Sequence, residues 1–142
     1  MRRNIIFVCL LLLLLTACGK NVNSGVAEMT TAQTVQEATY MQITPQEAKE
    51  IMDTEEGYVI LDVRSQSEYD EKHIPGAILI PDTEIEAKAE DILTEKDQLI
   101  LVYCRSGRRS KIASEALVKL GYTNVKEFGG IIDWPYEITT ED

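Results

Sequence analysis

The stretch QLILVYCRSGRRSKIASEALVKLGY, residues 98–122, decides the fold of this chain. Its first part, residues 98–104, is the most strand-like run of the sequence, because it is apolar and rich in residues that favour strands. The part from residue 109 predicts a helix that ends at Gly121. The apolar residues of this helix lie at helical spacing, namely Ile112, Ala116, Leu117 and Leu120. A buried strand that leads directly into a helix indicates an α/β domain.

Strands and helices also alternate on both sides of this stretch. Thr44, Pro45 and Glu47 predict a helix start, with a capping box and a proline at the first position. The other expected elements are strands at YVILDV (58–63), within IPGAILIP (74–81) and at NVKEF (124–128), a helical turn in SQSEYDEKH (65–73), and a helix at DTEIEAKAEDIL (82–93). Because several strands are apolar throughout, we expect a largely parallel sheet. Sites in such sheets lie beyond the carboxyl ends of strands, which is where Cys104 lies.

The N-terminal residues MRRNIIFVCLLLLLLTAC predict a secretory signal. Arg2 and Arg3 are followed by an apolar run, and the apolar stretch 5–17 has 13 residues, whereas a helix needs about 20 to cross a bilayer. The residues LTAC (15–18) resemble the lipobox of bacterial lipoproteins. This resemblance implies cleavage before Cys18 and lipidation of that cysteine. An ordinary cleaved signal is the main alternative.

We therefore expect a signal peptide at residues 1–17, a flexible polar tether at 18–39 and one monomeric domain at 40–142. The protein would be exported and anchored to a membrane by the lipid on Cys18, on the extracytoplasmic face. Without the two arginines of the signal, 12 basic residues remain against 24 acidic ones, a net charge near −12. This charge argues against nucleic acid as a partner and against electrostatic binding to anionic lipid.

Cysteine usage points to one reactive position. Cys9 lies in the signal and Cys18 at the expected lipidation site, which leaves Cys104 as a single thiol. Exported proteins normally use cysteines in pairs, because their compartment is oxidising. A single thiol there is either buried and inert or retained for its reactivity.

The loop CRSGRRS (104–110) favours reactivity. The segment Arg105–Arg109 precedes a helix, so its backbone N–H groups can converge on an anion, and Gly107 permits the tight turn that this needs. The helix dipole and the arginines would stabilise a thiolate, an oxyanion or a terminal persulfide. An inert cysteine before a basic helix start is the alternative. It does not explain cations at a helix N-terminus, where they cost stability unless an anion is bound.

Three segments resemble the rhodanese family of sulfurtransferases, in the family's order. They are LDVRSQSEYDEKHIPGAILIP (61–81), VYCRSGRRS (102–110) and GYTNVKEFGGIIDW (121–134). The resemblance covers nearly all of residues 40–137. It implies a single α/β domain with a five-stranded, mostly parallel sheet and helices on both faces.

The resemblance also implies a mechanism. The Cys104 thiolate would take the outer sulfur of thiosulfate or a polysulfide as a persulfide, which cyanide or a cellular thiol then accepts. The residues that would bind substrate are Arg105, Ser106, Gly107, Arg108 and Arg109. Among these, Arg105 and Arg109 would bind a sulfonate and Arg108 would add positive field. The loop Cys104–Arg109 has six residues, as in sulfurtransferases, whereas related phosphatases and arsenate reductases have seven. A binding or redox module without catalysis remains the other alternative.

Three further residues match the first family segment. Asp62 and Arg64 could support the active-site loop, although a structural ion pair, for example between Arg64 and Glu68, fits equally well. His73 is the only histidine and is mainly structural in the family pattern. We expect no cofactor, and no metal because one histidine and one free thiol make a poor ligand set.

Overall fold

Every strand of the sheet runs parallel to its neighbours. The structure is a computed structural model that describes residues 39–141. The strands are β1 (Met41–Gln42), β2 (Val59–Asp62), β3 (Ala77–Leu79), β4 (Ile100–Cys104) and β5 (Val125–Gly130), in the spatial order β1-β5-β4-β2-β3. The helices are α1 (Pro45–Thr54), α2 (Gln66–Glu71), α3 (Ile85–Ile92) and α4 (Arg108–Lys119), with short 3₁₀ helices η1 (Asp82–Glu84) and η2 (Ile131–Asp133). The expected five-stranded α/β fold is confirmed.

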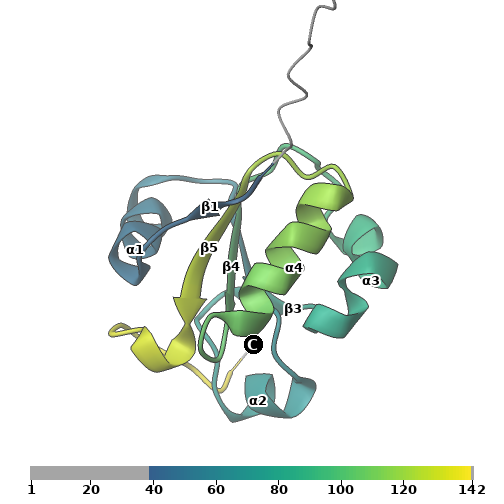
Figure 1. The fold of residues 1–142 in the computed structure, drawn as a ribbon. Coiled ribbons are helices and arrows are strands. Elements are labelled where there is room, and N and C mark those ends of the chain that lie inside the picture. Colours follow the sequence, from purple (N-terminus) through teal and green to yellow (C-terminus); the bar gives the residue numbers. More distant parts are fainter. Residues whose placement is uncertain (1–38, 142) are drawn as a thin grey trace, which may run out of the picture. The chain divides into compact units, whose positions relative to one another are not determined.

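Helices cover both faces of the sheet, with α3 and α4 on one side and α1 on the other (Figure 1). The alternation of side chains along β4 builds the two cores. Ile100, Val102 and Cys104 face the core beneath α3 and α4. Leu101 and Tyr103 face the core that contains α1. The nucleophile candidate therefore lies on the α4 side of the sheet.

The predicted start of α1 is confirmed. The Thr44 side chain accepts from the Glu47 N–H, and the Glu47 carboxylate accepts from the Thr44 N–H at 2.7 Å. These two bonds form the predicted capping box. The strand β1 was not predicted, because its two residues carry no apolar run and pair only with Lys126 and Glu127 of β5.

The buried face of α4 differs from the prediction in one respect. Ile112, expected on the apolar face, is 48% exposed. The buried residues of α4 are Ser110, Ala113, Ser114 and Leu117. Small side chains at helical spacing let the N-terminal half of α4 pack closely against the sheet. Ser110 lies on this buried face, 3.5 Å from Cys104 Sγ.

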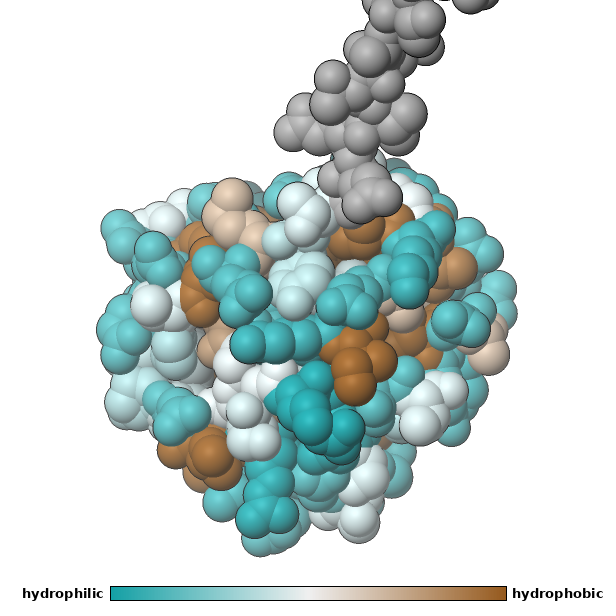
Figure 2. Space-filling view, viewed as in Figure 1, coloured by the Kyte–Doolittle hydropathy of each residue, from teal (hydrophilic) through white to brown (hydrophobic). Residues whose placement is uncertain are grey.

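Figure 2, seen from the same side as Figure 1, shows mostly hydrophilic side chains on this face, with hydrophobic groups in separate patches. No helix among residues 39–141 is long and apolar enough to span a membrane. The expected signal peptide, nearly all of the expected tether and Cys18 lie outside the described residues.

Candidate active site

The candidate nucleophile lies where β4 ends. Cys104 is the last residue of β4 and is 1% exposed. Beyond Val102 the register between β4 and β5 shifts, so that Cys104 lies opposite Gly130. The chain then turns through residues 105–107 into α4. This is the carboxyl edge of a parallel sheet, the position at which such folds place their sites.

The loop curls back so that its backbone binds the sulfur. The Gly107 N–H donates to Cys104 Sγ at 3.1 Å. Gly107 is the N-cap of α4 and has φ +92°, a left-handed conformation that glycine adopts without strain. The first turn of α4 has no side-chain cap and no acidic residue. Its N–H groups, which no side chain caps, and its dipole therefore favour an anion beside Cys104.

Gly129 and Gly130 form a double glycine at the end of β5, and Gly130 packs directly against the backbone of the loop. A Cβ atom on Gly130 would lie 2.2 Å from the Arg105 carbonyl oxygen and 2.5 Å from Ser106 Cα. Only glycine lets the strand approach the loop this closely. The Ile132 N–H also donates to the Arg105 carbonyl oxygen at 3.2 Å, which fixes the start of the loop.

The surroundings of Cys104 favour its ionised form. Burial raises the pKa of the thiol, but hydrogen bonds outweigh burial and hold the pKa below its ordinary value. These bonds come from the Ser110 hydroxyl and from the backbone N–H groups of Ser110, Ser106 and Gly107. A thiol of this kind is a candidate nucleophile, because the thiolate is the reactive form of cysteine.

Two buried residues that the sequence did not single out complete the site. The Cys104 thiol donates to Ser110 Oγ at 3.5 Å, and Ser110 Oγ donates to Glu127 Oε1 at 2.6 Å. The Gly129 N–H donates to the same carboxylate oxygen at 2.8 Å. Glu127 is only 2% exposed. One signal for Glu127 existed, because the alternation that turns Val125 inward also turns Glu127 inward.

The three arginines have different surroundings. Arg105 and Arg108 are exposed. Both terminal nitrogens of Arg109 bind the Glu68 carboxylate, each at 2.8 Å. These bonds, against the opposing effect of burial, lower the pKa of Glu68 from 4.5 to about 2. The positive charge of Arg109 is thus already matched by a carboxylate from α2.

The suggested ion pair between Arg64 and Glu68 is wrong. Arg64 Nη2 lies 2.6 Å from Asp62 Oδ2, and both side chains are buried. The reason is geometric: Asp62 ends β2 and Arg64 folds back over it, whereas Glu68 on α2 faces the start of α4. Arg64 also donates to the Lys72 carbonyl oxygen at 2.7 Å.

His73 is buried and stacks on Tyr69, with 3.8 Å between the ring centroids. Its Nδ1 lies 2.9 Å from the Tyr69 carbonyl oxygen, and its backbone pairs with Thr139. The next residue, Ile74, donates its N–H to the Tyr103 hydroxyl at 3.1 Å. The segment around His73 is therefore tied to the residue that precedes Cys104.

A small hollow of about 160 Å³ lies beside the loop. It is lined by Arg64, Glu68, Glu71, Lys72, Arg105, Ile131 and Ile132. A second hollow, of about 310 Å³, borders the loop at Ser106 and Gly107 and also contacts Glu127. Both are large enough for a small anion or the end of a thiol compound.

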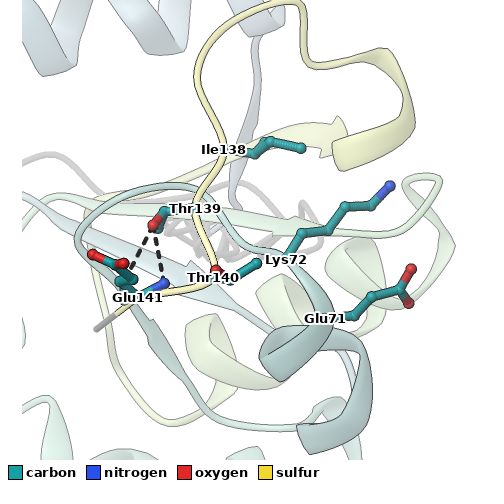
Figure 3. Close-up of a pocket in the computed structure, with 6 residues that line it drawn as sticks. All are labelled: Glu71, Lys72, Ile138, Thr139, Thr140 and Glu141. Carbon is teal, nitrogen blue, oxygen red and sulfur yellow. Dashed lines mark hydrogen bonds between the residues drawn. The ribbon is translucent and has the colours of Figure 1, made fainter.

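A further hollow of about 440 Å³ lies between the end of α2 and the C-terminal segment (Figure 3). It is lined by Glu71, Lys72, Ile138, Thr139, Thr140 and Glu141, none of which belongs to the predicted site. Among residues 39–141, no group of three or more histidine, cysteine or acidic side chains could hold a metal ion.

Comparison with known proteins agrees with the α/β fold. The family model described as "Rhodanese-like domain" matches residues 44–135. YrkF of Bacillus subtilis, a provisionally named sulfur carrier protein, is 40% identical over 87 residues, which cover 61% of this chain and 46% of YrkF. The thiosulfate sulfurtransferase PspE of Escherichia coli is 38% identical over 73 residues, covering 51% of this chain and 70% of PspE. The alignments thus span about half of the first relative and more of the second.

Solved structures share the fold. A crystal structure of a rhodanese-related protein from Thermoplasma volcanium is similar with a TM-score of 0.63 and 32% sequence identity. The similarity covers 72% of this chain and 100% of that chain.

Proposed function

This chain belongs to the rhodanese-like domain family, and on that premise we propose that it is a sulfurtransferase whose nucleophile is Cys104. It takes sulfane sulfur from a donor such as thiosulfate or a polysulfide and passes it to a thiol or to cyanide. The observation that carries the proposal is the position of Cys104. Its sulfur accepts the Gly107 N–H at 3.1 Å and lies at the start of a helix without a capping side chain.

The first half-reaction loads the sulfur. The Cys104 thiolate attacks the outer sulfur of thiosulfate, the S–S bond of the donor breaks, and sulfite leaves with the bonding electron pair. The enzyme then carries a persulfide whose negative charge resides on the outer sulfur. The N–H groups of residues 105–109 and the dipole of α4 stabilise this charge.

The second half-reaction returns the thiolate. Cyanide or a thiolate attacks the outer sulfur, and the bond between the two sulfurs breaks towards Cys104. Thiocyanate or a new persulfide leaves. Two such steps on one nucleophile predict ping-pong kinetics.

Arg105 and Arg109 have different roles in the proposed reaction. Arg109 is paired with Glu68, so its main contribution is to hold the loop against α2. Arg105 is exposed and lines the hollow beside the loop, so it is the better placed of the two to bind the sulfonate of the donor. The loop from Cys104 to Arg109 has six residues, which favours a sulfur substrate over the larger phosphate or arsenate.

The test is to supply the purified protein with thiosulfate and cyanide and to measure thiocyanate, together with the intact mass of the protein. We expect turnover and a mass gain of one sulfur atom. Both should disappear in Cys104→Ser. If neither thiosulfate nor a polysulfide loads sulfur on Cys104, catalysis is refuted and a binding module becomes the better explanation.

We also propose that the protein is exported and lipid-anchored at Cys18. The support is the sequence LTAC after an apolar run. Cells that express the full chain should incorporate a labelled fatty acid into it, and Cys18→Ala should abolish the labelling. Labelling that persists in the variant, or that is absent from both proteins, would refute the anchor.

A further inference from the structure

The Ser110 hydroxyl stands between two acids and has one proton to donate. Its oxygen lies 3.5 Å from Cys104 Sγ and 2.6 Å from Glu127 Oε1. A hydroxyl can donate to one acceptor at a time along its single O–H bond. In the structure this proton goes to Glu127, and the Cys104 thiol donates to Ser110 in turn. The three groups form a chain of hydrogen bonds that runs from the Cys104 thiol through Ser110 to Glu127.

The thiolate needs the opposite arrangement. Ser110 stabilises an ionised Cys104 only when its proton points to the sulfur. Glu127 would then keep only the Gly129 N–H as a partner, at 2.8 Å. Glu127 is 2% exposed, and no cation among the described residues forms an ion pair with it. A buried carboxylate in this position competes strongly for the one available donor.

We propose that Glu127 is a positioning residue that acts through Ser110 to control when Cys104 ionises. While Glu127 holds the Ser110 proton, it withholds a donor from the thiolate and adds a like charge nearby. Both effects oppose the free thiolate.

In the persulfide form, Cys104 and Glu127 compete less for the Ser110 proton. Its charge lies on the outer sulfur, one bond further from Ser110 and towards the N–H groups of the loop. Ser110 can then donate to Glu127 without cost to the charged group. Glu127 therefore favours the sulfur-loaded form of Cys104 over the free thiolate. This consequence rests on the proposed function, whereas the control of ionisation does not.

Other charged groups also face this pair from the elements packed around it. Arg109 of α4 interacts electrostatically with Cys104, and Tyr40, just before β1, interacts with Glu127. Lys111 of α4 and Asp133 of η2 line the same hollow as Glu127. All of these groups remain when Glu127 alone is changed, so a substitution there isolates the carboxylate.

The decisive variant is Glu127→Gln, which has nearly the same shape. Its amide oxygen can take the place of Oε1, which accepts from both Ser110 and Gly129. The substitution removes the negative charge, so this oxygen competes less strongly with the sulfur for the serine proton. The readout is the pH dependence of alkylation of Cys104 by iodoacetamide, followed by mass spectrometry of the peptide that contains it. This measurement needs no sulfurtransferase activity, so failure of the proposed function leaves the test intact.

We expect the alkylation midpoint to fall by about one pH unit in Glu127→Gln, which is roughly a tenfold larger thiolate fraction below both midpoints. In a Ser110→Ala background the same substitution should lower the midpoint by less than half as much. The exposed Glu115 of α4 provides a matched control, because Glu115→Gln should leave the midpoint unchanged.

An unchanged or higher midpoint in Glu127→Gln overturns the proposal, as does an equal shift in the Ser110→Ala background. Glu127→Asp provides a second variant if the glutamine protein fails to fold. It keeps the charge but withdraws the carboxylate from Ser110, so a smaller fall in the same direction is expected. No fall in the aspartate protein would also count against the proposal.

Discussion

Replacing Glu68 by Gln removes one charge from the pair that joins α2 to α4. The wild-type carboxylate binds both terminal nitrogens of Arg109, each at 2.8 Å. It also accepts the Ser65 N–H at 3.1 Å, which completes the capping box of α2. Glutamine can keep the capping bond, because Gln also serves in capping boxes. It can offer Arg109 one acceptor oxygen and no charge, so the substitution isolates the ion pair.

The pKa of Glu68 sets the size of the effect. It is about 2 in the folded protein, against an ordinary 4.5. Each pKa unit corresponds to about 1.36 kcal/mol, so the full difference would be roughly 3 kcal/mol. The side chains of Arg109 and Glu68 are 21% and 26% exposed, and partial exposure to solvent reduces the value of such a pair. We therefore expect Glu68→Gln to lower the free energy of unfolding by about 1–2 kcal/mol at pH 7.

The pH dependence provides the sharper signature. Because the folded-state pKa of Glu68 is depressed, its contribution is complete above about pH 4.5 and is lost as the pH falls towards 2. Urea unfolding, followed by circular dichroism between pH 7 and pH 2, measures the difference between wild type and variant. That difference should shrink below pH 4.5 and vanish near pH 2. The exposed Glu71 of the same helix provides the control, since Glu71→Gln should show no such trend.

Equal stability of Glu68→Gln and wild type at pH 7 would refute this account of the pair. A stability difference that persists unchanged at pH 2 would also refute it, because the effect would then come from packing or capping and not from charge.

Three other substitutions test the glycine behind the loop, with its control, and the buried ion pair. Gly130→Ala should reduce sulfur loading of the protein at least tenfold, because the new Cβ would lie 2.2 Å from the Arg105 carbonyl oxygen and displace the loop. Gly57→Ala, with nothing within 4 Å of its Cβ, should lower stability by about 1 kcal/mol and leave loading intact. Asp62→Asn should lower the free energy of unfolding by roughly 3–5 kcal/mol, because it leaves the Arg64 guanidinium buried without its counter-charge. A loss below 1 kcal/mol in urea unfolding would contradict that reasoning.

Much of the architecture follows from short-range patterns in the sequence. The capping box of Thr44 and Glu47 marks the start of α1, because both hydrogen bonds join residues three apart. The apolar run that ends at Cys104 becomes β4, and the segment after it becomes α4. Hydrophobic periodicity predicts the buried face of a helix less well where the buried side chains are small. Ile112 was placed in the core by its spacing, but Ala113 is the buried residue, because α4 packs closely on the sheet.

The contacts that organise the site join residues far apart in the chain. Glu68 pairs with Arg109, which is 41 residues away, and not with Arg64, which is four residues away. Glu127 binds Ser110 across 17 residues, through a strand and a helix that meet only in the folded sheet. From the sequence alone, an ion pair between near neighbours is the natural expectation. Tertiary packing decides which residues, distant in the chain, come within hydrogen-bonding distance.

Local patterns in the sequence predict the α/β class, the start of α1 and the candidate loop around Cys104, because hydrogen bonds between near neighbours and hydrophobic periodicity control these features. The tertiary structure alone decided the strand order β1-β5-β4-β2-β3 and the existence of a two-residue β1. It also decided the partners of the buried charges. A buried charge takes whichever partner the packing of distant elements brings within hydrogen-bonding distance. The partner of a buried charge therefore cannot be predicted from the residues next to it in the sequence.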